Sequence, residues 1–122
     1  MAIDKTQLLT ALREASELVE AAAAGQMSIP AFIERYQNFY YAAALDGHEE
    51  EPELLDLIRS NPEFVRIHEE TQREVVNATY LGPVQDPESL RSGGRITVEE
   101  AEARLRTIAS RHQLTKLLRA RF

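Results

Sequence analysis

The three histidines are the first candidates for metal or acid–base chemistry, and they lie far apart in the chain. A helical di-iron site needs Glu-x-x-His pairs, but an apolar residue stands three positions before each histidine. The run from His48 begins like the zinc motif His-Glu-x-x-His, but position 52 is a proline. We therefore expect no metal site, with His48 in a loop, His68 partly buried and His112 near a helix end.

Nucleophilic and phosphate-binding motifs are weak as well. No serine lies in a Gly-x-Ser-x-Gly elbow, and the absence of cysteine removes disulfides, thiolate ligands and cysteine nucleophiles. The run Ser92-Gly93-Gly94-Arg95 could cradle a phosphate, but it lacks the spacing and the lysine of a P-loop. Carboxylates are so abundant that a pair for acid–base catalysis can be imagined anywhere. We expect no catalytic residue and no cofactor.

Charge distribution is more informative than any motif. The 14 basic and 20 acidic residues give a net charge of −6, which argues against a general nucleic-acid or anionic-membrane binder. Residues 46–74 hold ten acidic and three basic residues, a net charge of −7, whereas residues 91–122 hold eight basic and three acidic residues, a net charge of +5. The acidic stretch is either a solvated helix face or a surface for a basic protein.

Two tyrosines precede the acidic stretch. Tyr40 and Tyr41 lie one to two turns before Asp46, and one of them must point away from the core, because adjacent helical positions lie about 100° apart. An aromatic anchor beside carboxylates suits an interface with a basic protein, since the ring supplies buried area and the acids supply steering. The expected partner-binding residues are Tyr40, Tyr41, Asp46, Glu49, Glu50, Glu51, Glu53 and Asp56.

Helices must position these residues, because apolar positions recur at helical spacing and no segment alternates strictly between apolar and polar. The first helix is expected at residues 5–24, with Gly25 as its stop. The second is expected to start after the N-cap candidate Ser28, with Pro30 in its first turn, and to end at Gly47.

The second half of the chain is divided in the same way. A short helix is expected to start at Pro52, and a longer one to follow the break at Asn61-Pro62. Residues 82–96, rich in glycine and proline, are expected to form a loop. Thr97 should open the last long helix through a capping box with Glu100, and leucines near the C-terminus should form a further turn that packs back.

These elements predict an all-α fold, an antiparallel bundle of four main helices with one or two short ones, in a single domain over residues 1–122. The longest apolar stretch is far short of the roughly 20 residues that span a membrane. The first residues lack a basic segment followed by an apolar one, so we expect no signal peptide and a cytoplasmic location.

Four segments together carry a resemblance to a known family. They are Gly25-x-x-Ser28-x-x-x-Phe32-x-x-x-Tyr36, the run Asn38-Phe39-Tyr40-Tyr41 leading to Leu45-Asp46-Gly47, the acid-rich stretch from Glu49 to Asp56, and Thr97-Val98-Glu99-Glu100-Ala101. In these segments the chain resembles bacterial toxin-immunity proteins of the colicin D immunity type. The resemblance implies a helical bundle that blocks a tRNA-cleaving nuclease by placing carboxylates where RNA phosphates would lie.

The leading hypothesis is therefore a non-enzymatic inhibitor that binds a cognate basic nuclease toxin through the acidic, tyrosine-containing surface. The alternative is a regulatory or adaptor module that binds a protein or a nucleic acid through the basic residues near the C-terminus. These are Arg104, Arg106, Arg111, Lys116, Arg119 and Arg121. A third hypothesis is a small-ligand enzyme using Arg91 and Arg95 of the 82–96 loop. Separately, the C-terminal Leu117, Leu118 and Phe122 either pack in the core or form a dimer contact.

Overall fold

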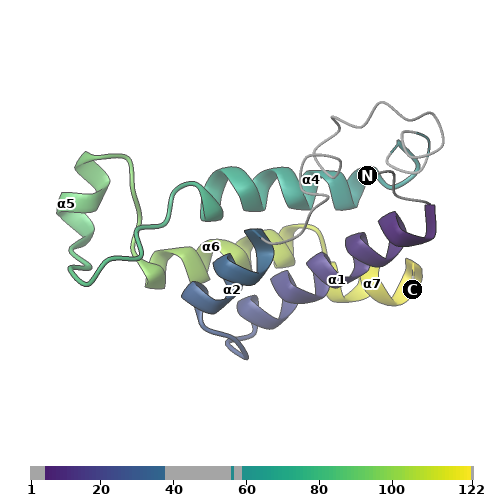
Figure 1. Cartoon of the computed structure of the whole chain (residues 1–122), viewed down its shortest axis with the longest axis horizontal. Helices are drawn as coiled ribbons and strands as arrows, with labels where there is room; N and C mark the ends of the chain where they lie inside the picture. The colour runs from purple at the N-terminus through teal and green to yellow at the C-terminus, as the bar shows by residue number, and fades with distance from the viewer. Residues whose placement is uncertain (1–4, 38–55, 57–58, 122) are drawn as a thin grey trace.

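The computed structural model describes residues 5–37, 56 and 59–121 of the chain. The described elements are α1 (Lys5–Ala23), α2 (Ile29–Gln37), α4 (Pro62–Thr71), the π-helix η2 (Gln72–Val76), α5 (Pro87–Ser92), α6 (Val98–Arg111) and α7 (Leu114–Arg121) (Figure 1). The predicted all-α class is confirmed for these residues, which contain no strand beyond one isolated bridge. The antiparallel arrangement of four main helices and the single domain stay predictions.

Helix α1 packs against α2, α4, α6 and α7. Its apolar residues recur every three or four positions, which places them on one face. Leu12, Ala15, Val19 and Ala22 are all fully buried there, as the sequence predicted. Gly25 ends the helix with a φ of 76°, a left-handed conformation that costs glycine little.

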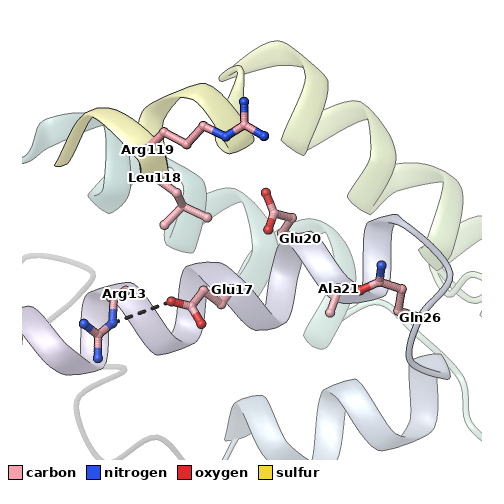
Figure 2. Close-up of a pocket in the computed structure, with 7 residues that line it drawn as sticks. All are labelled: Arg13, Glu17, Glu20, Ala21, Gln26, Leu118 and Arg119. Carbon is pink, nitrogen blue, oxygen red and sulfur yellow. Dashed lines mark ion pairs between the residues drawn. The ribbon is translucent and has the colours of Figure 1, made fainter. Parts of the chain in front are cut away.

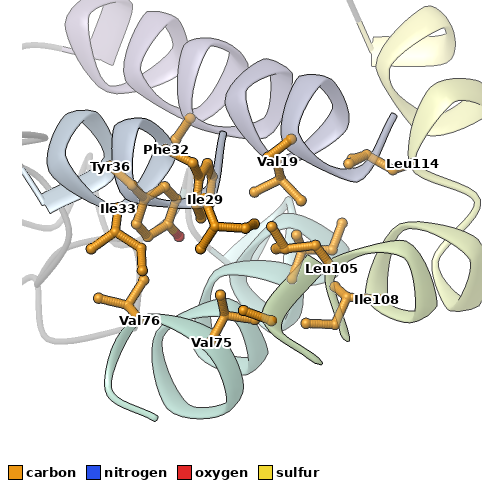
Figure 3. Close-up of a cluster of buried hydrophobic side chains, with 14 of the residues drawn as sticks. Val19, Ile29, Phe32, Ile33, Tyr36, Val75, Val76, Leu105, Ile108 and Leu114 are labelled. Carbon is orange, nitrogen blue, oxygen red and sulfur yellow. The ribbon is translucent and has the colours of Figure 1, made fainter. Parts of the chain in front are cut away.

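Helix α2 brings the aromatic residues to the core. The Ser28 side chain accepts a hydrogen bond from the Ala31 backbone N–H at 3.3 Å, so the predicted N-cap is confirmed. Phe32 is fully buried and stacks on Tyr36, with ring centroids 5.2 Å apart. Figure 3 shows both rings among aliphatic side chains from α1, η2 and α6. The predicted end of this helix at Gly47 and the predicted helix start at Pro52 lie outside the described residues.

Helix α4 begins at Pro62, so the predicted break at Asn61 is confirmed. The helix that begins at Pro62 does not continue as a regular α-helix as far as Gly82. After Thr71 the chain widens into η2, in which adjacent Val75 and Val76 are both buried. The wider turn leaves backbone carbonyls open to other donors, and the Arg104 guanidinium donates to the Glu74 carbonyl at 2.8 Å. Burial of both valines in the core and the hydrogen bond from Arg104 of α6 together favour the π-helix over a regular α-helix.

Residues 80–95 form an arm that projects away from the other helices (Figure 1). A parallel bridge between Thr79 and Ile96 closes its base. The Gln85 side chain donates to the Tyr80 and Gly82 carbonyls at 2.9 and 2.7 Å and accepts from the Val98 backbone N–H at 2.9 Å. The prediction of a plain loop over 82–96 is wrong, because the arm contains α5, a short helix with no buried residue.

Helices α6 and α7 complete the described fold. The predicted capping box is present, with Thr97 Oγ1 3.0 Å from the Glu100 N–H and Glu100 Oε1 3.1 Å from the Thr97 N–H. A tight turn follows at Gln113, where φ is 49°. It changes which positions along the chain face the core. Leu114 and Leu118 are buried as a result, which confirms that the C-terminal segment packs back on the core. Among the described helices, none has the length and apolarity to cross a bilayer.

Candidate functional site

Most of the predicted partner-binding residues lie in a segment that the structure does not describe. The residues outside the described part are Tyr40, Tyr41, Asp46, Glu49, Glu50, Glu51 and Glu53. Asp56 is described and exposed, and its backbone carbonyl accepts hydrogen bonds from the Ser60 N–H at 2.9 Å and the Ser60 hydroxyl at 2.8 Å. His48 also lies outside the described residues.

Two later acids of the acidic stretch are engaged inside the molecule. Glu70 accepts from Arg111 Nη1 at 2.9 Å and lies 2.6 Å from His112 Nε2, while Glu63 lies 3.1 Å from His112 Nδ1. These four residues, which we call the carboxylate clamp, tie α4 to the end of α6. Glu63 and Glu70 are seven residues apart, about two helical turns, so both carboxylates reach the same ring. They are therefore not equivalent to the other acids of residues 46–74.

His112 lies between the two carboxylates of the clamp. Each of its ring nitrogens faces a carboxylate oxygen, Nδ1 that of Glu63 and Nε2 that of Glu70. The side chain is 8% exposed and caps the C-terminus of α6. The predicted position of His112 near a helix end is confirmed.

The clamp also shifts the titration of Glu70. Burial acts to raise its pKa, but hydrogen bonds and charge interactions from His112 and Arg111 outweigh burial and lower the pKa below its ordinary 4.5. A carboxyl group with a lowered folded-state pKa stabilises the protein above its unfolded-state pKa. That contribution is lost as the pH falls through the folded-state value.

We expect Glu70→Gln to lower the free energy of unfolding at pH 7 by about 2 kcal/mol, because it removes a charged acceptor from two hydrogen bonds. The variant should also lose less stability than wild type when the pH falls below about 4.5. Urea unfolding at pH 7 and in acid measures both effects. The matched control is Glu69→Gln, an exposed neighbour that should change neither quantity. Equal stability of the two variants would contradict the role of the clamp.

A second histidine lies in the opposite environment. His68 contacts Ser16 Oγ through Nε2 at 3.3 Å and the Tyr36 hydroxyl through Nδ1 at 2.5 Å. Ser16 is fully buried, while Tyr36 and His68 are each 3% exposed. The prediction that His68 is partly buried is therefore wrong, since contacts from α1 and α2 close over α4. Burial lowers the pKa of His68 to about 4 and raises the pKa of Tyr36, so both are neutral at pH 7.

Serine and histidine in contact can act as nucleophile and base, but the burial of Ser16 leaves no room for a substrate at its hydroxyl. A neutral imidazole offers one donor and one acceptor, and a hydroxyl can take either part. The three side chains therefore satisfy one another's hydrogen-bonding groups in a dry junction of α1, α2 and α4. In this arrangement they stabilise the fold.

A groove of about 690 Å³ lies between α1 and α7 (Figure 2). Glu17 pairs with Arg13 at 3.6 Å, and Glu20 accepts from the Thr115 hydroxyl at 2.6 Å. Arg119 reaches over from α7 on the side of Glu20 (Figure 2). Two acidic and two basic side chains line this groove, so its charges give no net preference for a simple anion or cation.

Side chains in and beside the glycine-rich turn of the arm also make contacts within the protein. Arg95 donates through Nε and Nη2 to the Ala78 and Thr79 carbonyls at 3.1 and 2.8 Å. Arg91 lies 3.8 Å from Glu100, and the Ser92 hydroxyl donates to the Glu88 carbonyl at 3.1 Å. Arg95 and Arg91 thus connect the arm to the rest of the protein, while the Ser92 hydroxyl bonds within α5.

Basic side chains gather on α6 and α7. Residues 103–121 contain no acidic residue and six basic ones, all exposed. Arg106 pairs with Glu102 at 2.9 Å within α6. Lys116, Arg119 and Arg121 have no carboxylate partner among the described residues. The sequence identified all six positions, but only the structure separates paired from unpaired ones.

Within the described ranges no three His, Asp or Glu side chains come together in a way that could hold a metal ion. Comparisons of the chain with protein-family models, with curated proteins and with solved structures find no match. Any functional assignment therefore depends on the chemistry of this chain alone.

Proposed function

We propose that this chain is a non-enzymatic cytoplasmic inhibitor that binds a cognate basic nuclease toxin through its acidic, tyrosine-containing surface. The observation that carries the proposal is the position of the excess of acidic over basic residues. Residues 46–53 hold five acids and no basic residue, a net charge of −5. Residues 56–74 hold five acids and three arginines, a net charge of −2, and two of those acids belong to the carboxylate clamp.

The clamp supports this proposal in a second way. It leaves Asp46 to Glu53 as the densest acidic segment, and it ties the following helix, α4, to α6 at both Glu63 and Glu70. A fixed neighbouring helix lowers the entropy that an interface loses on binding. Asp56 stands exposed between this segment and α4, so it belongs to the proposed contact surface.

In the proposed complex the carboxylates take the positions of RNA phosphates in the basic cleft of the nuclease. Opposite charges accelerate association and weaken binding as salt rises, since the Debye length falls to about 8 Å at physiological ionic strength. Tyr40 or Tyr41 supplies the apolar anchor that fixes the position of the contact. Inhibition then follows from occupation of the cleft and needs no chemistry from this chain.

The proposal expects a neighbouring gene to encode a toxin with a basic nuclease domain, and the test expresses that domain with and without this chain. Glu49→Lys, Glu50→Lys and Glu51→Lys together should abolish protection and weaken binding by at least about 100-fold, because three attractive charges become repulsive. The matched control reverses exposed acids elsewhere, Glu14, Glu34 and Glu88, with the same change of net charge.

The control variant should protect as wild type does, and circular dichroism should show both variants folded. Full protection by the folded Glu49–Glu51 variant would overturn the proposed interface. Equal loss of protection by both variants would also overturn it, because net charge and not position would then explain the effect.

A further inference from the structure

A basic surface lies on α6 and α7, and the inference drawn from it is independent of the proposed inhibitor function. Its members, which we call the basic track, are Arg104, Arg111, Lys116 and Arg119, all exposed. The segment from 103 to 121 that carries them has no acidic residue. Such a run of one charge sign on the surface needs a counter-charge, either from solvent ions or from a partner.

The four track residues follow one path across the fold. Arg104 and Arg111 are seven residues apart, so they share one side of α6. Arg111 and Lys116 line the same groove of about 360 Å³ at the corner between α6 and α7. Lys116 and Arg119 are three residues apart on α7 and are neighbours on its surface. The track therefore runs from the middle of α6 across α7 to Arg119, at the edge of the groove between α1 and α7.

Internal contacts hold part of the track without removing its charge. The Arg104 guanidinium donates to the Glu74 carbonyl at 2.8 Å, which orients the side chain but does not neutralise it. Arg111 pairs with Glu70, yet its side chain stays 49% exposed. Glu63 on the groove wall contacts His112 and Arg66. Lys116 and Arg119 have no carboxylate partner within the described residues, so they are the two cations most available to a partner.

The chemistry of this surface favours the phosphate backbone of a duplex over other polyanions. An anionic membrane requires an apolar helix face beside the cations, but Leu114 and Leu118 of α7 are buried in the core. Single strands are bound by stacking on aromatic rings, and residues 103–121 contain no aromatic residue except the 8%-exposed ring of His112, which the clamp occupies.

We propose that the basic track binds the phosphate backbone of double-stranded DNA. The major groove of B-DNA is about 12 Å wide and admits an α-helix, whereas the deep, narrow major groove of duplex RNA does not. Helix α7 lies at one end of the described fold (Figure 1). It buries Leu114 and Leu118 and leaves Lys116 and Arg119 exposed. Both charges can then reach backbone phosphates while Arg104 and Arg111 extend the contact along α6.

The experiment measures binding of the purified chain to a short labelled DNA duplex by fluorescence anisotropy at several salt concentrations. Four phosphate contacts predict that the logarithm of the binding constant falls with the logarithm of salt with a slope of about −3.6. Lys116→Glu with Arg119→Glu should weaken binding at low salt at least tenfold. It should also reduce the steepness of the slope by about 1.8, since two contacts are lost.

The matched control is Arg35→Glu with Arg73→Glu, which makes the same change in net charge at two exposed arginines on α2 and η2. The control should retain most of the affinity and the full slope. Absence of DNA binding by the wild type at low salt would overturn the proposal, and so would an equal loss in both variants. Tighter binding to duplex RNA or to vesicles of anionic lipid than to the DNA would overturn the assignment to DNA.

Discussion

Lowering the pH from 7 to 4 should remove about 3 kcal/mol from the free energy of unfolding through His68 alone. In the unfolded chain this imidazole has its ordinary pKa of 6.5, whereas in the folded protein burial lowers the pKa to about 4. The unfolded state therefore binds the proton first. The stability is complete above pH 6.5, falls as the pH drops towards 4, and shows no further loss from this group below that value.

The size of this effect follows from the surroundings of the ring. Ser16 and Tyr36 present hydroxyls to the two ring nitrogens, an arrangement that satisfies a neutral imidazole. An imidazolium would need two acceptors and a counter-charge in the same dry junction. Burial is accordingly the cause of the lowered pKa of His68.

Urea unfolding between pH 7.5 and pH 5 measures the effect before the Glu70 contribution begins. The non-titrating variant His68→Gln should show a much flatter pH dependence than wild type over this range. His112→Gln is the control, since it makes the same substitution at the carboxylate clamp and leaves the buried junction intact. Wild-type stability that does not change between pH 7.5 and pH 5 would contradict a buried neutral His68.

Phe32→Ala should be the most destabilising single truncation in α2, at about 3–5 kcal/mol. The ring is fully buried and stacks on Tyr36, so its removal opens a cavity and leaves Tyr36 without its aromatic neighbour. Small domains are stable by about 5–15 kcal/mol in total, so the loss is a large fraction of that margin. Thermal and urea unfolding followed by circular dichroism give the free-energy difference directly.

Phe32→Leu is the matched control, because it keeps an apolar side chain in the same space and should cost clearly less than the alanine variant. A Phe32→Ala protein as stable as Phe32→Leu would show that this ring is not a main support of the core.

The sequence predicted the helices best where the signals are local. The capping box at Thr97, the break at Asn61 and the stop at Gly25 each depend on side chains within a few residues of the helix end. The buried stripe of α1 followed from spacing alone, because burial of one face is what makes an amphipathic helix stable in a folded protein.

The sequence was less informative where a segment depends on distant contacts. No local pattern in residues 72–76 predicts a π-helix. The π-helix is supported by a hydrogen bond from Arg104 to the carbonyl of Glu74, thirty residues earlier in the chain. The arm was predicted as a loop from its glycines and prolines, yet Pro87 opens α5 there. Its base is fixed by the pairing of Thr79 with Ile96, which no local pattern encodes.

Two of the three histidines, His68 and His112, illustrate the division between the two levels. The sequence by itself determined that the chain is helical, that its charge is segregated, and that no cysteine chemistry is available. Only the tertiary structure decided that His68 is neutral between two hydroxyls from residues 52 and 32 positions away, and that His112 lies between two carboxylates. The reason is physical: helix formation and net charge are set by neighbours along the chain, whereas protonation and the availability of a charge are set by neighbours in space.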